Sequence, residues 1–417
     1  MERMRLLGWD RWVRAGLLFA AAAAFLVPAQ SASAAPAPTE LVLAGPTKPV
    51  GAGAAAKLTA TLTSAGKPLA GKSVSFLSGT TAVGKAKTDS KGRATESVKL
   101  TAPATFTAAY TPVGADAAAY APAQSAPVSL SPAAKVSVRV GSYLHSGRRA
   151  VGIPSSRVRL RGSVSPYVAG TTVEISVFRD SRRVAHKTVP VANAGNGRGK
   201  YAVGFSPRGR GVHRITASLA GADGDSARLY VVRPSAQSGS RGIGVRALQR
   251  RLKDLGYVTP VNGHYGDSTS RAVLAFRKVN GFGRLTSANR KVFTRLAAGG
   301  GGFKLRYPKA GKHAEFDWSR QVLVLANRGK AQVIVHTSSG KPSTPTVFGH
   351  YRFYRKEPGT NSHGMYYSTY FVGGYAVHGY PSVPTYPASH GCIRIPIPSA
   401  KRVYGWLGLG DDIWTYR

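Results

Sequence analysis

Cys392 is the only cysteine among 417 residues, and it lies in the stretch PASHGCIRIP, between Gly391 and Ile393. A single cysteine cannot form a disulfide within its own chain, so it is either an inert residue or a reactive thiol. Inert cysteines lie among apolar neighbours in a core. A histidine two positions before Cys392 and an arginine two positions after it instead favour the thiolate by lowering the pKa of the thiol. The pattern predicts a nucleophilic cysteine with a lowered pKa.

Two histidines are candidates for the base that this thiol needs. A free thiol is only a few per cent thiolate at neutral pH, so it requires a base or a positive field. His378 or His390 could take the proton, and Arg394 adds positive charge. Gly391 places no side chain beside the nucleophile, so backbone N–H groups, including that of Cys392, can approach a developing oxyanion. The spacing of these residues leaves the choice between the two histidines open.

Three further histidines of the same region are interpreted as bystanders. We expect His336, His350 and His363 to be surface or core residues rather than participants. No pair of cysteine or histidine residues has the spacing of metal ligands, and acidic residues are scarce in this region. The sequence therefore predicts no metal site and no cofactor.

The N-terminus has the pattern of a secretory signal peptide. A basic head, MERMRLLGWDRWVR, is followed by the apolar run Ala15 to Val27 and by the small-residue site Ala32-Ser33-Ala34. The alternative is a membrane anchor, but the run is shorter than the roughly 20 apolar residues that a span needs. We expect residues 1–34 to be removed and the mature protein to be secreted to the cell wall.

The charge of the chain points to polyanionic partners. The sequence has 58 Lys and Arg residues against 17 Asp and Glu residues, a net charge of +41. Such a charge inside a cell would suggest nucleic acid. For a secreted protein we expect no nucleic-acid partner, and anionic wall polymers or lipid surfaces become the nearer candidates. The alternative is that the charge only keeps the chain soluble.

Two stretches before residue 234 alternate apolar and polar residues between turn clusters. Residues 38–131 contain Leu58, Ala60 and Leu62, and residues 134–233 repeat the pattern with Val136 and Val138. Short strands at regular spacing are typical of an all-β sandwich. Both stretches resemble bacterial immunoglobulin-like modules. Neither holds a cluster of histidine or acidic residues, so both are interpreted as spacers.

Residues 241–297 change to a helical period. Val245, Leu248 and Leu252 share one face of a helix that ends at Gly256, and Asp267 is expected to cap the next helix. A third short helix, SANRKVFTRLA, follows. The string from GVRALQRRLKDLGY to NGHYGDSTSRAVLAF resembles the peptidoglycan-binding three-helix domain. The resemblance implies binding to peptidoglycan; the alternative is a purely structural bundle.

Residues 303–417 hold the predicted chemistry. FDWSRQVLVLANRGKAQVIVH predicts buried strands around an Asn327-Arg328-Gly329 turn. The blocks PTVFGHYRF, MYY, HG and SHGCIR follow in order, and a final strand, DDIWTYR, ends the segment. This segment strongly resembles the YkuD-type catalytic domain of L,D-transpeptidases. The fold class expected for the whole chain is therefore multidomain, with two immunoglobulin-like sandwiches, a three-helix domain and a mainly-β catalytic domain.

The resemblance to L,D-transpeptidases also implies roles for individual residues. Cys392 would attack the stem peptide, His378 would be the base, and His390 would help to shape the site. The peptide oxygen of Gly379 would orient the base. The residues expected at the oxyanion or the substrate are Gly391, Ser389, Arg394, Tyr366 and Met365. His378 and Cys392 are 14 positions apart, toward the short side of the family's spacing.

The implied activity is the formation of 3→3 cross-links between peptidoglycan stem peptides through a cysteine acyl-enzyme, with peptidoglycan stems and glycan as partners and carbapenems as acylating inhibitors. Two alternatives stay open. Water could capture the same intermediate, which would make the protein an L,D-carboxypeptidase. The chain could also be a non-catalytic wall-binding scaffold, although its intact histidines and cysteine favour an enzyme.

Overall fold

The computed structural model describes residues 35–51, 53–219 and 222–417. The predicted signal peptide, residues 1–34, lies outside the described residues. The chain forms two compact units. The first comprises Thr59–Glu96, Thr107–Pro127 and the described residues up to Ala44, and the second comprises Gly45–Leu58, Ser97–Phe106 and Val128–Arg417. Among the described residues, no helix is both long enough and apolar enough to cross a membrane.

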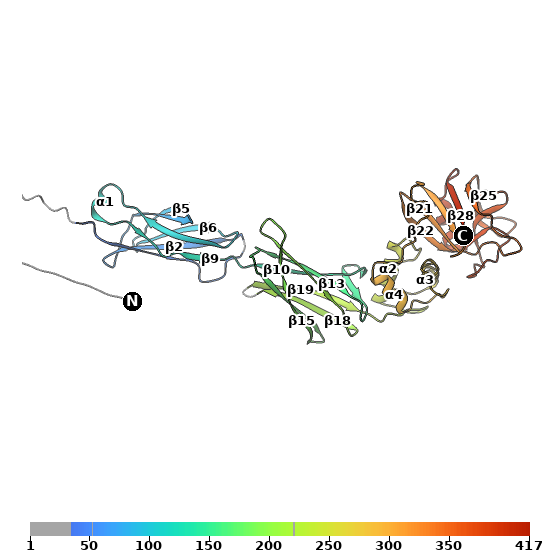
Figure 1. Ribbon diagram of the computed structural model, residues 1–417, viewed down its shortest axis with the longest axis horizontal. Helices are drawn as coiled ribbons and strands as arrows, with labels where there is room; N and C mark the ends of the chain where they lie inside the picture. Colours follow the sequence, from blue (N-terminus) through green and yellow to red (C-terminus); the bar gives the residue numbers. More distant parts are fainter. Residues whose placement is uncertain (1–34, 52, 220–221) are drawn as a thin grey trace, which may run out of the picture. The chain divides into compact units, whose positions relative to one another are not determined.

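Residues 39–130 are mainly β-structure (Figure 1). One sheet has the order β1-β2-β3, with β6 also on β2, and another has the order β5-β4-β7-β8, with β9 also on β7. The alternation predicted from the sequence is present, since Leu58, Ala60 and Leu62 on β2 are buried. The elements are β1 (Thr39–Ala44), β2 (Ala55–Ser64), β3 (Lys67–Pro68), β4 (Ser73–Ser78), β5 (Thr81–Lys87), β6 (Arg93–Lys99), β7 (Ala104–Tyr110), α1 (Ala115–Ala119), β8 (Ala123–Gln124) and β9 (Val128–Leu130).

Residues 135–231 form two further sheets, with the orders β10-β13-β17-β16 and β11-β12-β19-β18-β14-β15. Val136 and Leu160 of the first sheet share one hydrophobic core with Ile175 and Ile215 of the second, so the two sheets pack face to face. The strands are β10 (Lys135–Gly141), β11 (Leu144–Ser146), β12 (Arg149–Gly152), β13 (Val158–Ser165), β14 (Thr172–Arg179), β15 (Arg182–Pro190), β16 (Ala192–Asn193), β17 (Gly199–Phe205), β18 (Gly211–Leu219) and β19 (Ala222–Val231).

Three helices follow: α2 (Ile243–Asp254), α3 (Asp267–Val279) and α4 (Arg290–Ala297). We call residues 243–297 the helical module. The predicted apolar face of α2 is buried, and Gly256, at φ +95°, follows the helix as the expected C-terminal stop. The expected cap of α3 is wrong in one respect: Gly266 is the N-cap and Asp267 is the first helical residue. Its carboxylate still lies in the first turn, where it complements the helix dipole.

The helical module shares its hydrophobic core with neighbouring parts of the chain. Its buried residues Leu248, Phe276 and Phe293 belong to one hydrophobic cluster with Val324 and Ile334 of the C-terminal region. Lys278 of α3 is also buried, at 3% exposure, and its Nζ donates to the carbonyl oxygens of Gln321 at 3.2 Å and Thr337 at 3.0 Å. The module and the following sheet are therefore packed as neighbours.

The C-terminal region has two sheets and one helix. The first sheet has the order β22-β21-β20-β28-β23, and the second has the order β24-β25-β26-β27. The strand β21 is almost wholly buried, as its apolar run predicts, and it turns into β22 through Arg328 and Gly329, both with positive φ. The elements are β20 (His313–Asp317), β21 (Val322–Asn327), β22 (Lys330–His336), β23 (Gly349–Arg352), β24 (Arg355–Thr360), β25 (Tyr366–Val372), β26 (Tyr375–Tyr380), β27 (Ile393–Pro396), α5 (Ile397–Trp406) and β28 (Asp412–Tyr416).

Candidate active site

The parallel pairing of β26 and β27 places His378 and Cys392 on the same side of β26. His378 is opposite Arg394 in this ladder, and Cys392 directly precedes β27 and packs against Ala376 of β26. Residues two apart on a strand project from the same face. His378 therefore lies on the face of β26 that carries Ala376 and the thiol, although 14 positions separate it from Cys392 in the sequence.

The thiol of Cys392 is partly buried. Its Sγ donates to the carbonyl oxygen of Gly374 at 3.6 Å, and Met365, Tyr370 and Ala376 pack around it. Burial raises the pKa of Cys392, and this outweighs the hydrogen bond from the Ala376 backbone, which acts to lower it. The predicted lowering of the thiol pKa is therefore wrong.

The imidazole of His378 has the tautomer and the charge state of a proton acceptor. Its side chain is 2% exposed, and its Nδ1 lies 3.0 Å from the carbonyl oxygen of Gly379. A carbonyl oxygen only accepts, so Nδ1 donates and Nε2 is left with a free lone pair. Burial lowers the pKa of His378 to about 4, and the charge of Arg394 acts in the same direction. The imidazole is therefore neutral at neutral pH. The contact with Gly379 is the one that the family resemblance implied.

Gly391 adopts a conformation that few other residues tolerate. Its φ is +121°, and a Cβ at this position would lie 2.3 Å from Cε1 of Tyr375. The Gly391 N–H donates to Oγ of Ser389 at 3.0 Å, and its carbonyl oxygen accepts from Oγ1 of Thr346 at 2.6 Å. Its N–H is thus already paired within the loop, which differs from the expectation that this part of the backbone is open to an oxyanion.

Ser389 holds the loop that carries the nucleophile. It is 1% exposed, and its hydroxyl donates to the carbonyl oxygen of Cys392 at 2.6 Å while accepting from the Gly391 N–H. Its own backbone N–H donates to the carbonyl oxygen of Ser339 at 2.8 Å. Because these contacts use both sides of the hydroxyl, Ser389 fixes the backbone around Cys392 in this structure, and its hydroxyl is not turned outward to a substrate.

The other predicted site residues have different surroundings. Met365 packs next to the thiol, as a substrate-side residue would. Tyr366 instead packs against the core of the C-terminal region and pairs with Gly379. The guanidinium of Arg394 lies 4.0 Å above the ring of Tyr380. His390 is exposed, so solvent reaches it although His378 is enclosed.

Sequence reasoning missed the residues that support this loop. The Gln321 amide donates to Oγ of Ser339 and accepts from the Ser339 backbone N–H, both at 2.9 Å, and the Thr346 hydroxyl donates to the carbonyl oxygen of Gly391. The ring of Tyr375 occupies the space beside Gly391. The segment TSSGKPSTPT (337–346) has the composition of an ordinary polar loop, and only its position in the fold distinguishes it.

The three histidines interpreted as bystanders lie in three different environments. His336 is buried, and burial together with the charge of Lys278 lowers its pKa to about 3. His350 stacks on Trp414 with ring centroids 4.3 Å apart, and His363 is exposed. In the described part of the chain, no three His, Cys, Asp or Glu side chains gather where they could hold a metal ion.

Comparisons with known proteins give two family matches. Residues 311–414 match the model of the L,D-transpeptidase catalytic domain, and residues 241–283 match that of a putative peptidoglycan binding domain. The comparison with curated proteins gives no match.

Several solved structures are similar to parts of the chain. An L,D-transpeptidase from Xylanimonas cellulosilytica is 34% identical over 44% of this chain and 98% of that chain, with a TM-score of 0.42. An L,D-transpeptidase from Stackebrandtia nassauensis is 21% identical over 44% of this chain and 96% of that chain, with a TM-score of 0.29. The catalytic domain of an E. faecium L,D-transpeptidase, acylated by ertapenem, is 27% identical over 25% of this chain and 97% of that chain, with a TM-score of 0.22.

The family matches confirm a catalytic domain of the L,D-transpeptidase type and a peptidoglycan-binding helical domain within one chain. The chain belongs to the L,D-transpeptidase family.

Proposed function

We propose that the protein is a secreted cell-wall enzyme that forms 3→3 cross-links between peptidoglycan stem peptides through an acyl-enzyme on Cys392. The observation that carries this proposal is the pairing of β26 with β27. It sets a histidine with a free Nε2 lone pair and the only thiol of the chain on one face of a sheet.

In the first step, Sγ of Cys392 attacks the carbonyl carbon that precedes the terminal D-alanine of a tetrapeptide stem. Burial raises the pKa of Cys392 and lowers that of His378, so the resting pair is a neutral thiol and a neutral imidazole. The proton therefore moves from Sγ to Nε2 of His378 as the attack proceeds, which is general-base catalysis. The C–N bond then breaks, His378 returns the proton to the leaving amine, and D-alanine departs from a thioester.

In the second step, the side-chain amine of a diamino acid on a neighbouring stem attacks the thioester. Nε2 of His378 accepts a proton from this amine, and the C–S bond breaks as the new amide forms. The proton then returns to sulfur, which restores the neutral pair. The contact of Nδ1 with Gly379 supports this cycle, because it keeps the ring in one orientation while Nε2 gains and loses the proton.

The helical module would keep the enzyme at its substrate. Its match to a putative peptidoglycan binding domain supports binding to the wall, and the net charge of +41 suits a polyanionic surface.

A defined disaccharide-tetrapeptide tests the reaction. We expect mass analysis to show cross-linked dimer and free D-alanine in equal amounts. Tripeptide without dimer would show that water is the acceptor, and the protein would then be an L,D-carboxypeptidase. Unchanged tetrapeptide would leave the chain a non-catalytic scaffold.

Ertapenem tests the nucleophile. A thiol opens the β-lactam ring by attack on its carbonyl, so we expect one added mass equivalent per chain. Cys392→Ala should remove the labelling completely. Labelling that persists in this variant would refute the assignment of Cys392.

A further inference from the structure

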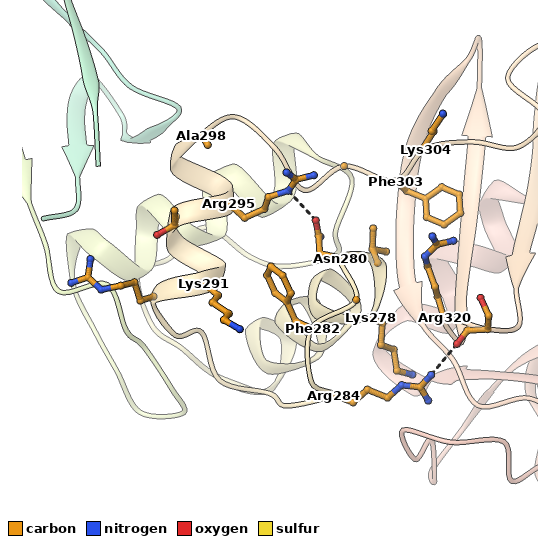
Figure 2. A pocket seen from close by; sticks show the side chains of 16 residues that line it. Lys278, Asn280, Phe282, Arg284, Lys291, Arg295, Ala298, Phe303, Lys304 and Arg320 are labelled. Atoms are coloured by element: carbon orange, nitrogen blue, oxygen red, sulfur yellow. Dashed lines mark hydrogen bonds between the residues drawn. The ribbon is translucent and has the colours of Figure 1, made fainter. Parts of the chain in front are cut away.

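A basic groove runs beside the helical module. It has a volume of about 1220 Å³. One wall is α4 with the loop after α3, and the other comprises residues 302–304 and 319–320. Figure 2 shows Lys291 and Arg295 on one side, Lys304 and Arg320 on the other, and Phe282 between them. Neither Cys392 nor His378 lines this groove.

The groove carries only positive charge. None of the 16 described residues that line it is acidic. Buried Lys278 lies at its base, and six further cations line it with exposed side chains: Arg284, Arg290, Lys291, Arg295, Lys304 and Arg320. Cations gathered in a concave surface raise the local concentration of anions.

Most of this charge is not neutralised within the protein. The side chains of Lys291 and Lys304 make no hydrogen bond or ion pair with the described residues. Arg284 and Arg295 donate to uncharged oxygen atoms, those of the Ser319 carbonyl and the Asn280 side chain. Of the six exposed cations, Arg320 alone has an acidic partner among the described residues, the buried Asp317. A bound anion would therefore relieve the repulsion between like charges.

The basic surface extends beyond this groove. A second hollow of about 460 Å³ shares Lys304, Ser319 and Arg320 with it and adds Arg306 and Arg417. Its one acidic lining residue among those described, Asp317, is buried and paired with Arg320. A continuous row of cations suits a linear polyanion better than a single small ion, because several charges of one molecule can bind at once.

The chemistry of the walls indicates the kind of polyanion. The guanidinium groups match the oxygen atoms of a phosphate in a two-pronged contact. Nucleic acids would also need free aromatic faces on which bases stack. Phe282 and Phe303 are half-buried and pack against the shared hydrophobic cluster, and Phe282 meets Phe276 edge-on at 6.3 Å. Both aromatic rings therefore contribute to the hydrophobic cluster rather than to a surface for base stacking.

We propose that this groove binds a linear polyol-phosphate polymer through its phosphodiester groups. The site goes beyond the acyl transfer proposed above, and neither proposal depends on the other.

Binding of purified poly(glycerol phosphate) to the full chain tests the proposal. The groove variant replaces three exposed cations, Lys291→Gln, Arg295→Gln and Lys304→Gln. A matched control, Arg182→Gln, Arg183→Gln and Lys187→Gln, removes the same charge from another basic hollow of about 830 Å³. We expect the groove variant to bind about tenfold more weakly, with a log–log salt slope smaller by roughly 2. The control should bind nearly as well as the wild type. Equal losses in the two variants would overturn the proposal, because they would show general charge attraction.

Two further polymers of equal charge number test the ligand class. Poly-L-glutamate offers carboxylates and single-stranded DNA offers phosphates with bases. We expect both to bind the full chain more weakly than poly(glycerol phosphate). Equal or tighter binding of either polymer would overturn the polyol-phosphate assignment.

Amine acetylation locates the site on the wild-type protein without any substitution. Bound poly(glycerol phosphate) should protect Lys291 and Lys304 from acetylation several-fold more than it protects Lys187. Equal protection of the three lysines would contradict the site. Activity on a soluble tetrapeptide stem, measured with the same groove variant, should be unchanged, so failure of the groove proposal and failure of the proposed acyl transfer remain distinguishable.

Discussion

Two neutral groups, a thiol and an imidazole, make up the candidate catalytic pair of Cys392 and His378. Burial acts on the two residues in opposite directions, because it disfavours the anionic thiolate and the cationic imidazolium alike. The pair is therefore kept from forming an ion pair before substrate arrives, and the proton moves only during attack. The pKa of each group then determines where activity begins to fall with pH.

The roles of the two histidines can be separated by substitution. His378→Ala should lower the single-turnover rate of acylation by ertapenem about 10²- to 10⁴-fold, which is the usual contribution of a general base. His390→Ala should cause a clearly smaller loss, since His390 is exposed. Mass analysis of acyl-enzyme against time measures both. A larger loss in His390→Ala would reverse the assignment, and circular dichroism of each variant controls for unfolding.

The acid limb of the pH profile should lie unusually low. His378 accepts a proton only while neutral, and burial lowers its pKa to about 4, so kcat/KM should fall as the pH decreases through about 4. The charge of Arg394 also lowers this pKa, so Arg394→Gln should move the acid limb to higher pH. An acid limb near the ordinary histidine pKa in the wild type, or a downward shift in the variant, would contradict this explanation.

At the scale of elements, the loop between β26 and β27 determines the position of the nucleophile. Ser389 joins two backbone groups of the loop, and Thr346 joins it to the segment before β23. The ring of Tyr375, at the start of β26, closes the space beside Gly391. The thiol is held by these neighbours rather than by a regular strand, because Cys392 lies just before β27 begins.

A methyl group at position 391 should disrupt this loop. Gly391→Ala would place Cβ 2.3 Å from the ring of Tyr375, at a φ of +121°. The backbone strain alone costs about 1–3 kcal/mol, and the overlap must displace the ring or the loop. We expect acylation to be almost lost and thermal unfolding to occur at lower temperature.

The double variant Gly391→Ala/Tyr375→Ala separates the two causes. It removes the ring but not the positive φ, so it should regain part of the lost acylation rate. Tyr375→Ala alone is the control. A double variant no faster than Gly391→Ala would show that steric overlap with Tyr375 is not the cause.

At the scale of the whole molecule, the helical module and the catalytic domain share a core. Val324 and Ile334 of the catalytic domain lie in the cluster built by α2, α3 and α4. Nζ of Lys278 donates to two catalytic-domain carbonyl oxygens, those of Gln321 and Thr337. Excision of the module would therefore expose apolar surface and leave these carbonyl oxygens without their donor. Surface substitutions are the better means of studying wall binding.

Lys278 should give the stability of the protein a distinct pH dependence. Burial lowers its pKa from 10.5 to about 7 in the folded protein. Between these values the unfolded chain holds a proton that the folded chain has released, so stability rises with pH. The slope contributed by this residue is at most about 1.4 kcal/mol per pH unit.

Denaturant unfolding at several pH values from 7 to 10 measures this contribution. Lys278→Met should lose the slope, while Lys253→Met, which replaces an exposed lysine of α2, should keep it. Parallel stability curves for the wild type and Lys278→Met would show that Lys278 keeps its proton on folding.

The sequence by itself determined the candidate catalytic residues and the helical segments of residues 241–297. A lone cysteine after Ser-His-Gly, a His-Gly pair upstream and helical spacing in residues 241–297 are all properties of neighbouring residues, so the catalytic candidates and the helices α2 to α4 could be predicted. Tertiary structure decided what depends on burial and on contacts between distant segments. The pKa of Cys392 is raised by burial, and the thiol packs against a cluster that β25 and β26 supply together with Met365. The choice of His378 as the enclosed histidine depends on the β26–β27 register. Likewise, the burial of Lys278 and the gathering of cations in the basic groove depend on the packing of the catalytic domain beside the helical module, because desolvation and the repulsion of gathered charges arise only when separate elements meet.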